Sequence, residues 1–150
     1  MGRKMEFQVD ILNEYKRWID CASDEEIKQE LALMKDNFEE INESFYKELD
    51  FGTSGMRGIL GAGTNRLNTY VLRRSNLALA SHINKNCASK SVVISYDSRK
   101  NSSRFARETA ALMSAMGIKA YLFSELTPVP VLVYAITKLS CDYGIMITAS

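Results

Sequence analysis

The sequence has few of the residues that many catalytic and metal sites require. Its 150 residues include one histidine and three cysteines. Cys21, Cys87 and Cys141 are far apart and form no CxxC pair, which excludes zinc-site spacing and predicts reduced thiols in the core of a cytosolic protein. His82 falls in the middle of an expected helix, which favours a structural imidazole at or near the surface over a catalytic one.

An excess of either charge is also lacking. Lys and Arg together number 19, whereas Asp and Glu number 18. Affinity for nucleic acid or an anionic membrane grows with the number of cations that replace counterions, so this balance excludes such partners and requires any anion site to be local. Charged residues interrupt the first nineteen positions, MGRKMEFQVDILNEYKRWI, which therefore form neither a signal peptide nor a membrane span.

Repeats and low-complexity tracts are absent, and the composition is that of an ordinary globular domain. Apolar residues make up 46% and charged residues 25% of the chain. A chain of this length can bury one well-filled core but not several.

The first part of the chain, residues 1–48, has the pattern of a helical extension. Ser23 followed by Glu26 is a capping box that starts a second helix, and a third helix is expected over 38–47. We expect these helices to pack on another part of the protein. The first helix is expected to face inward with Phe7, Ile11, Tyr15, Trp18 and Ile19. The second is expected to face inward with Ile27, Leu31 and Met34.

Residues 49–150 alternate between amphipathic helices and short apolar strands. Helices are expected over 68–86, from Ser102 to Gly117, and over 131–139, with Ser102 as the N-cap and Gly117 as the left-handed stop. Strands are expected in SVVISYD, IKAYLF and YGIMIT. This order predicts an α/β fold with a mostly parallel, mixed sheet covered by helices on both faces.

The segments that follow the strands are polar, and in such sheets ligands bind beyond the carboxyl ends of the strands. In SYDSRKNSS, Asp97 and Arg99 precede a helix start, where an anion site is possible, although an ion pair that braces the loop is the favoured interpretation. Ser150 follows the third strand. A serine needs an activating base or metal, or must already carry the transferred group, and no triad partner is evident here.

The stretch FGTSGMRG, residues 51–58, exposes an unusual amount of backbone. Its N–H groups can form an anion-binding concavity, with Arg57 as a phosphate clamp and Thr53 and Ser54 as further donors. The alternative is a tight loop whose glycines serve only left-handed turns. The following GAGTNRLN, with Arg66, slightly favours the phosphate site, but neither GxxxxGK[ST] nor GxGxxG occurs.

Taken together, FGTSGMRG, YDSRKNSS, LTPVP and GIMITAS resemble, in order and spacing, the first domain of the α-D-phosphohexomutase superfamily, the phosphoglucomutases and phosphomannomutases. The resemblance covers residues 49–150. The helical start and the run FYKELDFGTSGMRGILGAGTNRLN are similar to the branch with certain bacterial phosphoglucomutases, phosphopentomutase and the sugar-bisphosphate synthase.

The resemblance implies a role for each candidate residue. Ser150 is implied to be the catalytic phosphoserine, which also binds the metal through its phosphate, and Arg57 to contact that phosphate. Thr53, Ser54 and Gly55 are implied to line the approach of the substrate. Asp97 and Arg99 are implied to hold neighbouring loops near the sugar phosphate.

The implied reaction is the interconversion of hexose 1-phosphate and hexose 6-phosphate, most simply of glucose, through a bisphosphate intermediate. Magnesium and a sugar bisphosphate activator are the implied cofactors, but the aspartates that bind magnesium in the family belong to a later domain. We therefore expect this chain to be an inactive N-terminal fragment of a cytoplasmic mutase. Loss of covering chain would expose Ile145 and Ile147 and permit self-association.

Two other classes remain open. Another member of the superfamily, a phosphopentomutase or a sugar-bisphosphate synthase, would use the same site. A non-catalytic phosphate-binding or interaction module would use the glycine-rich loop to hold an anion and the helical extension to dock a partner.

Overall fold

The computed structural model describes residues 2–53 and 55–148, with side chains from residue 10 onward. These residues form two compact units, Met1–Val71 and Leu72–Ser150. This division differs from the predicted domains, 1–48 and 49–150, which follow the sequence pattern and the family resemblance and not compactness. The predicted boundary at residue 49 therefore stays a prediction. No helix in the described ranges is both long enough and apolar enough to cross a membrane.

The first unit contains three helices, α1 (Gly2–Cys21), α2 (Glu25–Leu33) and α3 (Phe38–Phe45), as the periodicity predicts. Phe45 packs edge-on against the rings of Tyr15 and Trp18, with centroid distances of 5.8 and 5.6 Å. Edge-to-face packing is a preferred arrangement of aromatic rings, so this cluster fixes α1 against α3. The prediction for Ile19 was wrong, since its position on α1 leaves it 46% exposed.

The start of α2 differs from the predicted capping box. The N-cap is Asp24, whose carboxylate accepts hydrogen bonds from the N–H groups of Glu26 and Ile27. Ser23 instead contacts the Tyr70 hydroxyl, which accepts from its backbone N–H at 2.7 Å. A carboxylate also interacts favourably with the positive end of the helix dipole. A tertiary contact thus removes Ser23 from the capping role that its spacing suggests.

The partner on which the helices pack is the segment that follows the glycine-rich stretch. We call residues 59–68 the base loop. Ala62 and Val71 belong to the same buried cluster as α1, α2 and α3. The side-chain amide of Asn68 donates to the carbonyls of Gly61, Gly63 and Arg66. One buried side chain therefore holds three backbone carbonyls of the base loop together.

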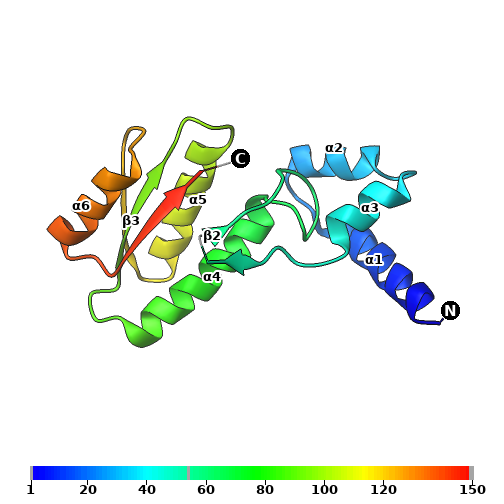
Figure 1. The fold of residues 1–150 in the computed structure, drawn as a ribbon, viewed down its shortest axis with the longest axis horizontal. Coiled ribbons are helices and arrows are strands. Elements are labelled where there is room, and N and C mark those ends of the chain that lie inside the picture. Colours follow the sequence, from blue (N-terminus) through cyan, green and yellow to red (C-terminus); the bar gives the residue numbers. More distant parts are fainter. Residues whose placement is uncertain (1, 54, 149–150) are drawn as a thin grey trace. The chain divides into compact units, whose positions relative to one another are not determined.

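The second unit is the predicted α/β fold, and Figure 1 shows its layers. Three parallel strands lie in the order β4-β3-β5. In this unit α5 covers one face of the sheet and α6 covers the other (Figure 1). The central strand β3 is buried along its whole length, as expected for a strand covered on both faces. The elements of this unit are most of α4 (Thr69–Asn86), whose first three residues belong to the first unit, and then β3 (Ser91–Tyr96), α5 (Ser102–Ala115), β4 (Lys119–Leu122), α6 (Val129–Leu139) and β5 (Tyr143–Ile147).

The two ends of α5 give one confirmed prediction and one correction. Gly117 has φ +75° and follows the C-cap Met116, so it is the left-handed stop that the sequence predicts. The N-cap, however, is Asn101, with φ +67°, and Ser102 is the first helical residue. The hydroxyl of Ser102 donates to the Asp97 carboxylate at 2.7 Å, and this contact replaces capping.

The predicted burial of the thiols and the predicted exposure of the last strand both need correction. The cysteines are free, but Cys21 is exposed, and Cys87 and Cys141 are only partly buried, so they are not core thiols. Ile147 is only 8% exposed because β5 pairs with β3, so the prediction was wrong for this residue, whereas Ile145 is partly exposed. Exposed apolar side chains lie instead on α6, at Val129, Val133 and Tyr134 among others. Self-association of the chain remains a prediction.

Candidate functional site

The glycine-rich stretch forms a small β-hairpin in the first unit. Strands β1 (Phe51–Gly52) and β2 (Gly55–Met56) pair antiparallel, with Gly52 opposite Gly55. Gly55 has φ +107°, and a Cβ there would meet no heavy atom within 4 Å. The hairpin therefore needs glycine at this position for its backbone conformation and not for space.

The predicted contact residues of this hairpin lie at its surface. Thr53 and Arg57 are exposed and Gly55 is partly buried, whereas Ser54 lies outside the described residues. Among the described residues, no carboxylate forms an ion pair with Arg57. An exposed guanidinium without an internal partner is available to bind a carboxylate or phosphate with two parallel hydrogen bonds.

The base loop holds both ends of the hairpin. The backbone N–H of Leu49 donates to Thr64, and that of Leu67 donates to Ile59, at 2.9 and 2.8 Å. The Thr64 hydroxyl also donates to the carbonyl of Lys47. Both ends of the segment 50–58 are therefore held by the base loop, which packs on the helices of this unit and so positions the hairpin.

The second group of glycines serves the base loop and not a phosphate. Arg66 lies 3.5 Å from the Glu43 carboxylate, and only 15% of its side chain is exposed. Gly61 and Gly63 have positive φ angles, and a Cβ on Gly63 would lie 2.4 Å from the Ser44 carbonyl oxygen. For GAGTNRLN the structure therefore favours the tight-turn interpretation.

In the second unit the segments after the strands meet at one edge of the sheet, as predicted. The backbone N–H of Asp97, which follows β3, donates to Ile147 at the end of β5. The segment after β4 is joined to β3 in the same way. The backbone N–H of Thr127 donates to the carbonyl of Tyr96, and the buried Ser95 hydroxyl donates to the carbonyl of Thr127 at 2.6 Å. The carboxyl ends of all three strands are therefore joined.

Asp97 is the centre of a polar cluster at this edge. One carboxylate oxygen accepts from the Ser102 hydroxyl and the Arg99 backbone N–H, at 2.7 and 3.1 Å. The other accepts from the Thr148 hydroxyl at 2.6 Å and lies 3.5 Å from the Arg99 guanidinium. The predicted pairing of Asp97 with Arg99 is thus present, and it extends to Thr148, which the sequence analysis did not single out.

The cluster favours the ionised carboxylate. Burial alone would raise the pKa of Asp97, but the hydrogen bonds from Thr148, Ser102 and the Arg99 N–H, together with the Arg99 charge, lower it below its ordinary value. A carboxylate with both oxygens so engaged repels a phosphate instead of binding it. Asp97 is therefore suited to organise the edge of the sheet.

The lowered pKa of Asp97 predicts acid sensitivity of this unit. Its folded-state pKa lies below the unfolded value, so its contribution to stability is present above about pH 4 and is lost as the pH falls through the lowered pKa. We expect the Asp97→Asn variant to lose less stability between about pH 5 and pH 2 than the wild type, as measured by urea unfolding followed by circular dichroism. Asp20→Asn is the control, since the exposed side chain of Asp20 forms no hydrogen bond or ion pair with a described residue, and an equal effect there would contradict the assignment.

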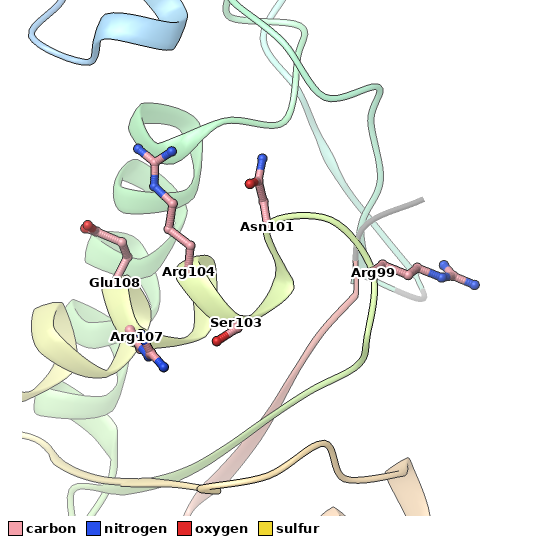
Figure 2. A pocket seen from close by; sticks show the side chains of 6 residues that line it. All are labelled: Arg99, Asn101, Ser103, Arg104, Arg107 and Glu108. Atoms are coloured by element: carbon pink, nitrogen blue, oxygen red, sulfur yellow. The ribbon is translucent and has the colours of Figure 1, made fainter.

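An open cavity of about 490 Å³ lies at the start of α5, lined by Arg99, Asn101, Ser103, Arg104, Arg107 and Glu108. Figure 2 shows that the guanidinium groups of Arg99, Arg104 and Arg107 point in different directions. The Glu108 carboxylate accepts two hydrogen bonds from Arg73, at 3.0 and 2.7 Å. The arginines do not converge on a common point, and we assign no ligand to this cavity.

Comparison with known proteins places these features in a family. Residues 48–150 match the family described as phosphoglucomutase/phosphomannomutase, alpha/beta/alpha domain I. The chain is 39% identical over 124 residues to a phosphoglucomutase of Staphylococcus saprophyticus, covering 79% of the chain and 22% of that protein. It is 36% identical over 135 residues to the phosphopentomutase of Mus musculus, covering 84% and 22%, respectively. The chain thus spans about a fifth of the length of these curated relatives, and no solved structure matches it.

Proposed function

Because the chain belongs to the phosphoglucomutase/phosphomannomutase family, in which residues 48–150 form domain I, we propose that it contributes the phosphoserine and a phosphate contact to a phosphosugar mutase. The reaction is the interconversion of hexose 1-phosphate and hexose 6-phosphate, with glucose as the first candidate sugar. The match to domain I carries this proposal. Two features support it: the exposed Arg57, which pairs with no carboxylate of the described residues and lies on a supported hairpin, and the organised edge beside Thr148.

The proposed chemistry is transfer of a phosphoryl group between Ser150 and the sugar. The serine Oγ–P bond breaks as a bond forms between phosphorus and a sugar hydroxyl oxygen, and the hydroxyl proton ends on the serine oxygen. The bisphosphate then returns its other phosphoryl group to the serine by the reverse step. Such in-line transfer depends on positioning and on stabilising charge at the equatorial oxygens, which the guanidinium of Arg57 and the backbone N–H groups of residues 53–57 can supply. Ser54 and Ser150 lie outside the described residues.

Arg57 and Ser150 belong to different units, so their approach to one another is itself part of the proposal. Thr53, Ser54 and Gly55 are proposed to line the path of the substrate. Asp97 and Arg99, first expected among the substrate contacts, are proposed to act on the protein itself by holding the loops after β3 and β5.

Magnesium is expected of the whole enzyme, where it would neutralise phosphate charge. Among the described residues, no three His, Cys, Asp or Glu side chains are grouped so that they could hold a metal ion. No step above depends on a metal site. A sugar bisphosphate activator would serve to load Ser150 with its phosphoryl group. We expect the enzyme to act in the cytoplasm.

A second candidate within the family is favoured by one observation. The mouse relative, 36% identical to this chain over 84% of its length, is a phosphopentomutase, so the similarity is not confined to phosphoglucomutases. A pentose phosphate is therefore the alternative substrate. A sugar-bisphosphate synthase would differ in releasing the bisphosphate.

The proposal is tested with the longer protein that contains this chain, incubated with magnesium and glucose 1,6-bisphosphate. We expect intact-mass and peptide analysis to find one added phosphoryl group, on Ser150, and a coupled assay to detect conversion of glucose 1-phosphate. Ribose 1-phosphate, with an assay that detects ribose 5-phosphate, tests the pentose alternative. We expect the 150-residue chain alone to give no turnover. Phosphate binding by the longer protein without turnover of either sugar would favour the non-catalytic module.

A further inference from the structure

The hydroxyl of Thr148 is fixed on two sides at the end of β5. It donates to the Asp97 carboxylate at 2.6 Å and accepts a hydrogen bond from the Arg99 guanidinium at 3.1 Å. A threonine hydroxyl has one donor hydrogen, and here this hydrogen and an acceptor lone pair are both engaged. Both partners are charged, and hydrogen bonds to charged groups are stronger than neutral ones.

The partners of Thr148 are themselves fixed. The fully buried Ser102, on α5, donates its hydroxyl hydrogen to the Asp97 carboxylate. The backbone N–H of Asp97 donates to the carbonyl of Ile147. The last register position between the strands joins Tyr96 and Ile147. The ladder between β3 and β5 is therefore continued past its end by a side-chain clamp, which we define as Asp97, Arg99 and Thr148.

The covalent chain carries the effect of this clamp to Ser150. Two residues of fully extended chain span at most about 7 Å, so the Cα atom of Ser150 stays within about that distance of the Cα atom of Thr148. Free rotation about the backbone of residue 148 would let the serine sweep much of that sphere. Fixing the Thr148 side chain against β3 holds residue 148 in place, so the chain to Ser150 starts from a fixed point beside the edge of the sheet.

We propose that Thr148 is a positioning residue for the phosphoryl transfer, acting through the clamp and not by touching the substrate. This inference rests on the proposed function, which makes Ser150 the phosphoryl carrier. A nucleophile or phosphoryl donor misplaced by about 1 Å can lose roughly 100-fold in rate. Removing the hydroxyl should therefore slow the chemical step and leave ground-state binding of the sugar phosphate nearly unchanged.

The clamp is first tested in the 150-residue chain by hydrogen exchange of backbone amides, with no substrate present. Thr148→Val keeps the shape of the side chain and removes the hydroxyl. We expect faster exchange at the Asp97 amide in this variant, protection restored in Thr148→Ser, and no change in Thr137→Val. The control is matched because, among the described residues, the Thr137 hydroxyl donates within its own helix, to the carbonyl of Val133. Equal protection of the Asp97 amide in all variants would show that the clamp does not hold this edge.

The functional consequence is tested in the longer protein with the coupled assay. We expect Thr148→Val to lower kcat roughly 10- to 100-fold with KM changed by less than about 2-fold, and Thr148→Ser to restore most of the rate. Thr137→Val should match the wild type. Thr148→Ala, which cannot overpack, gives the same loss should the valine variant fold poorly.

The outcomes separate the two inferences. A wild-type protein without phosphosugar turnover would overturn the proposed function, whereas the exchange experiment would still decide whether the clamp exists. A wild-type protein with turnover, and a Thr148→Val variant with unchanged kcat, would overturn the positioning role alone. A raised KM at unchanged kcat would overturn it as well, because it would place Thr148 in ground-state binding.

Discussion

Replacing Ser150 with alanine in the longer protein is expected to abolish phosphosugar turnover, with kcat lowered roughly 1,000-fold or more. The proposed reaction passes the phosphoryl group through the serine oxygen, and loss of a covalent nucleophile costs more than loss of a group that only stabilises charge. No other hydroxyl is proposed to accept the group. The measurement is the coupled assay, together with mass analysis after incubation with glucose 1,6-bisphosphate.

Ser103 provides the control for this variant. Ser103 lies at the start of α5 and is not part of the Asp97 cluster, so Ser103→Ala should retain turnover and phosphoryl loading. Comparable rates for Ser150→Ala and the wild type would mean that another residue carries the phosphoryl group. Loading of the Ser150→Ala protein on a different serine would lead to the same conclusion.

The second large effect is expected on stability, from Gly63→Val in the base loop. A Cβ at this position would lie 2.4 Å from the carbonyl oxygen of Ser44 and 2.8 Å from its Cβ, in a region where Ser44 is 1% exposed. The backbone φ of +126° is also strained for any residue with a side chain. Overpacking and backbone strain together are expected to lower the free energy of unfolding by roughly 3 kcal/mol or more.

A change of this size is a large part of the stability of an ordinary domain, which is about 5–15 kcal/mol. Urea unfolding followed by tryptophan fluorescence should show it, because the single tryptophan, Trp18, lies in the core of the same unit. Gly55→Val is the matched control, since Gly55 also has positive φ but has open space around it. An equally small loss in both variants would mean that the contact with Ser44 is easily relieved.

The order of helices and strands could be predicted from the sequence because it depends on local patterns. Spacing of apolar residues predicted α1 to α3, and the short apolar runs predicted the parallel sheet of the second unit. Gly117 was predicted as a helix stop because a left-handed residue after a helix is a local requirement. Asp97 and Arg99 were expected to pair because they are two residues apart on one loop.

The corrections arise where distant residues compete with local patterns. Ser23 has the spacing of a capping residue, but Tyr70, 47 positions later, engages it. Ser102 likewise has the sequence context of a cap but donates to Asp97. No local pattern distinguishes these serines from true caps.

Thr148 was missed for the same reason, since its contact with Asp97 spans 51 positions. One signal was available, because the carboxyl ends of parallel strands meet and a hydroxyl after β5 must lie near the acidic loop after β3. The alternation of strands and helices gives this adjacency, but it does not give the pairing of individual atoms. Only the register of β3 with β5 brings Thr148 and Asp97 together.

The hydrogen bonds of the base loop have a consequence for exchanging parts between related enzymes. Glu30 on α2 accepts from the N–H of Ala62 at 2.6 Å, and the side-chain amide of Asn65 donates to the carbonyl of Glu43 at the other end of the helical region. A chimera that takes residues 1–48 from one homologue and the rest from another would separate these partners. The segment to exchange is therefore the whole span from the first helix through the base loop, hairpin included. Because α4 (Thr69–Asn86) continues past Val71, recombination libraries should place their crossover after that helix.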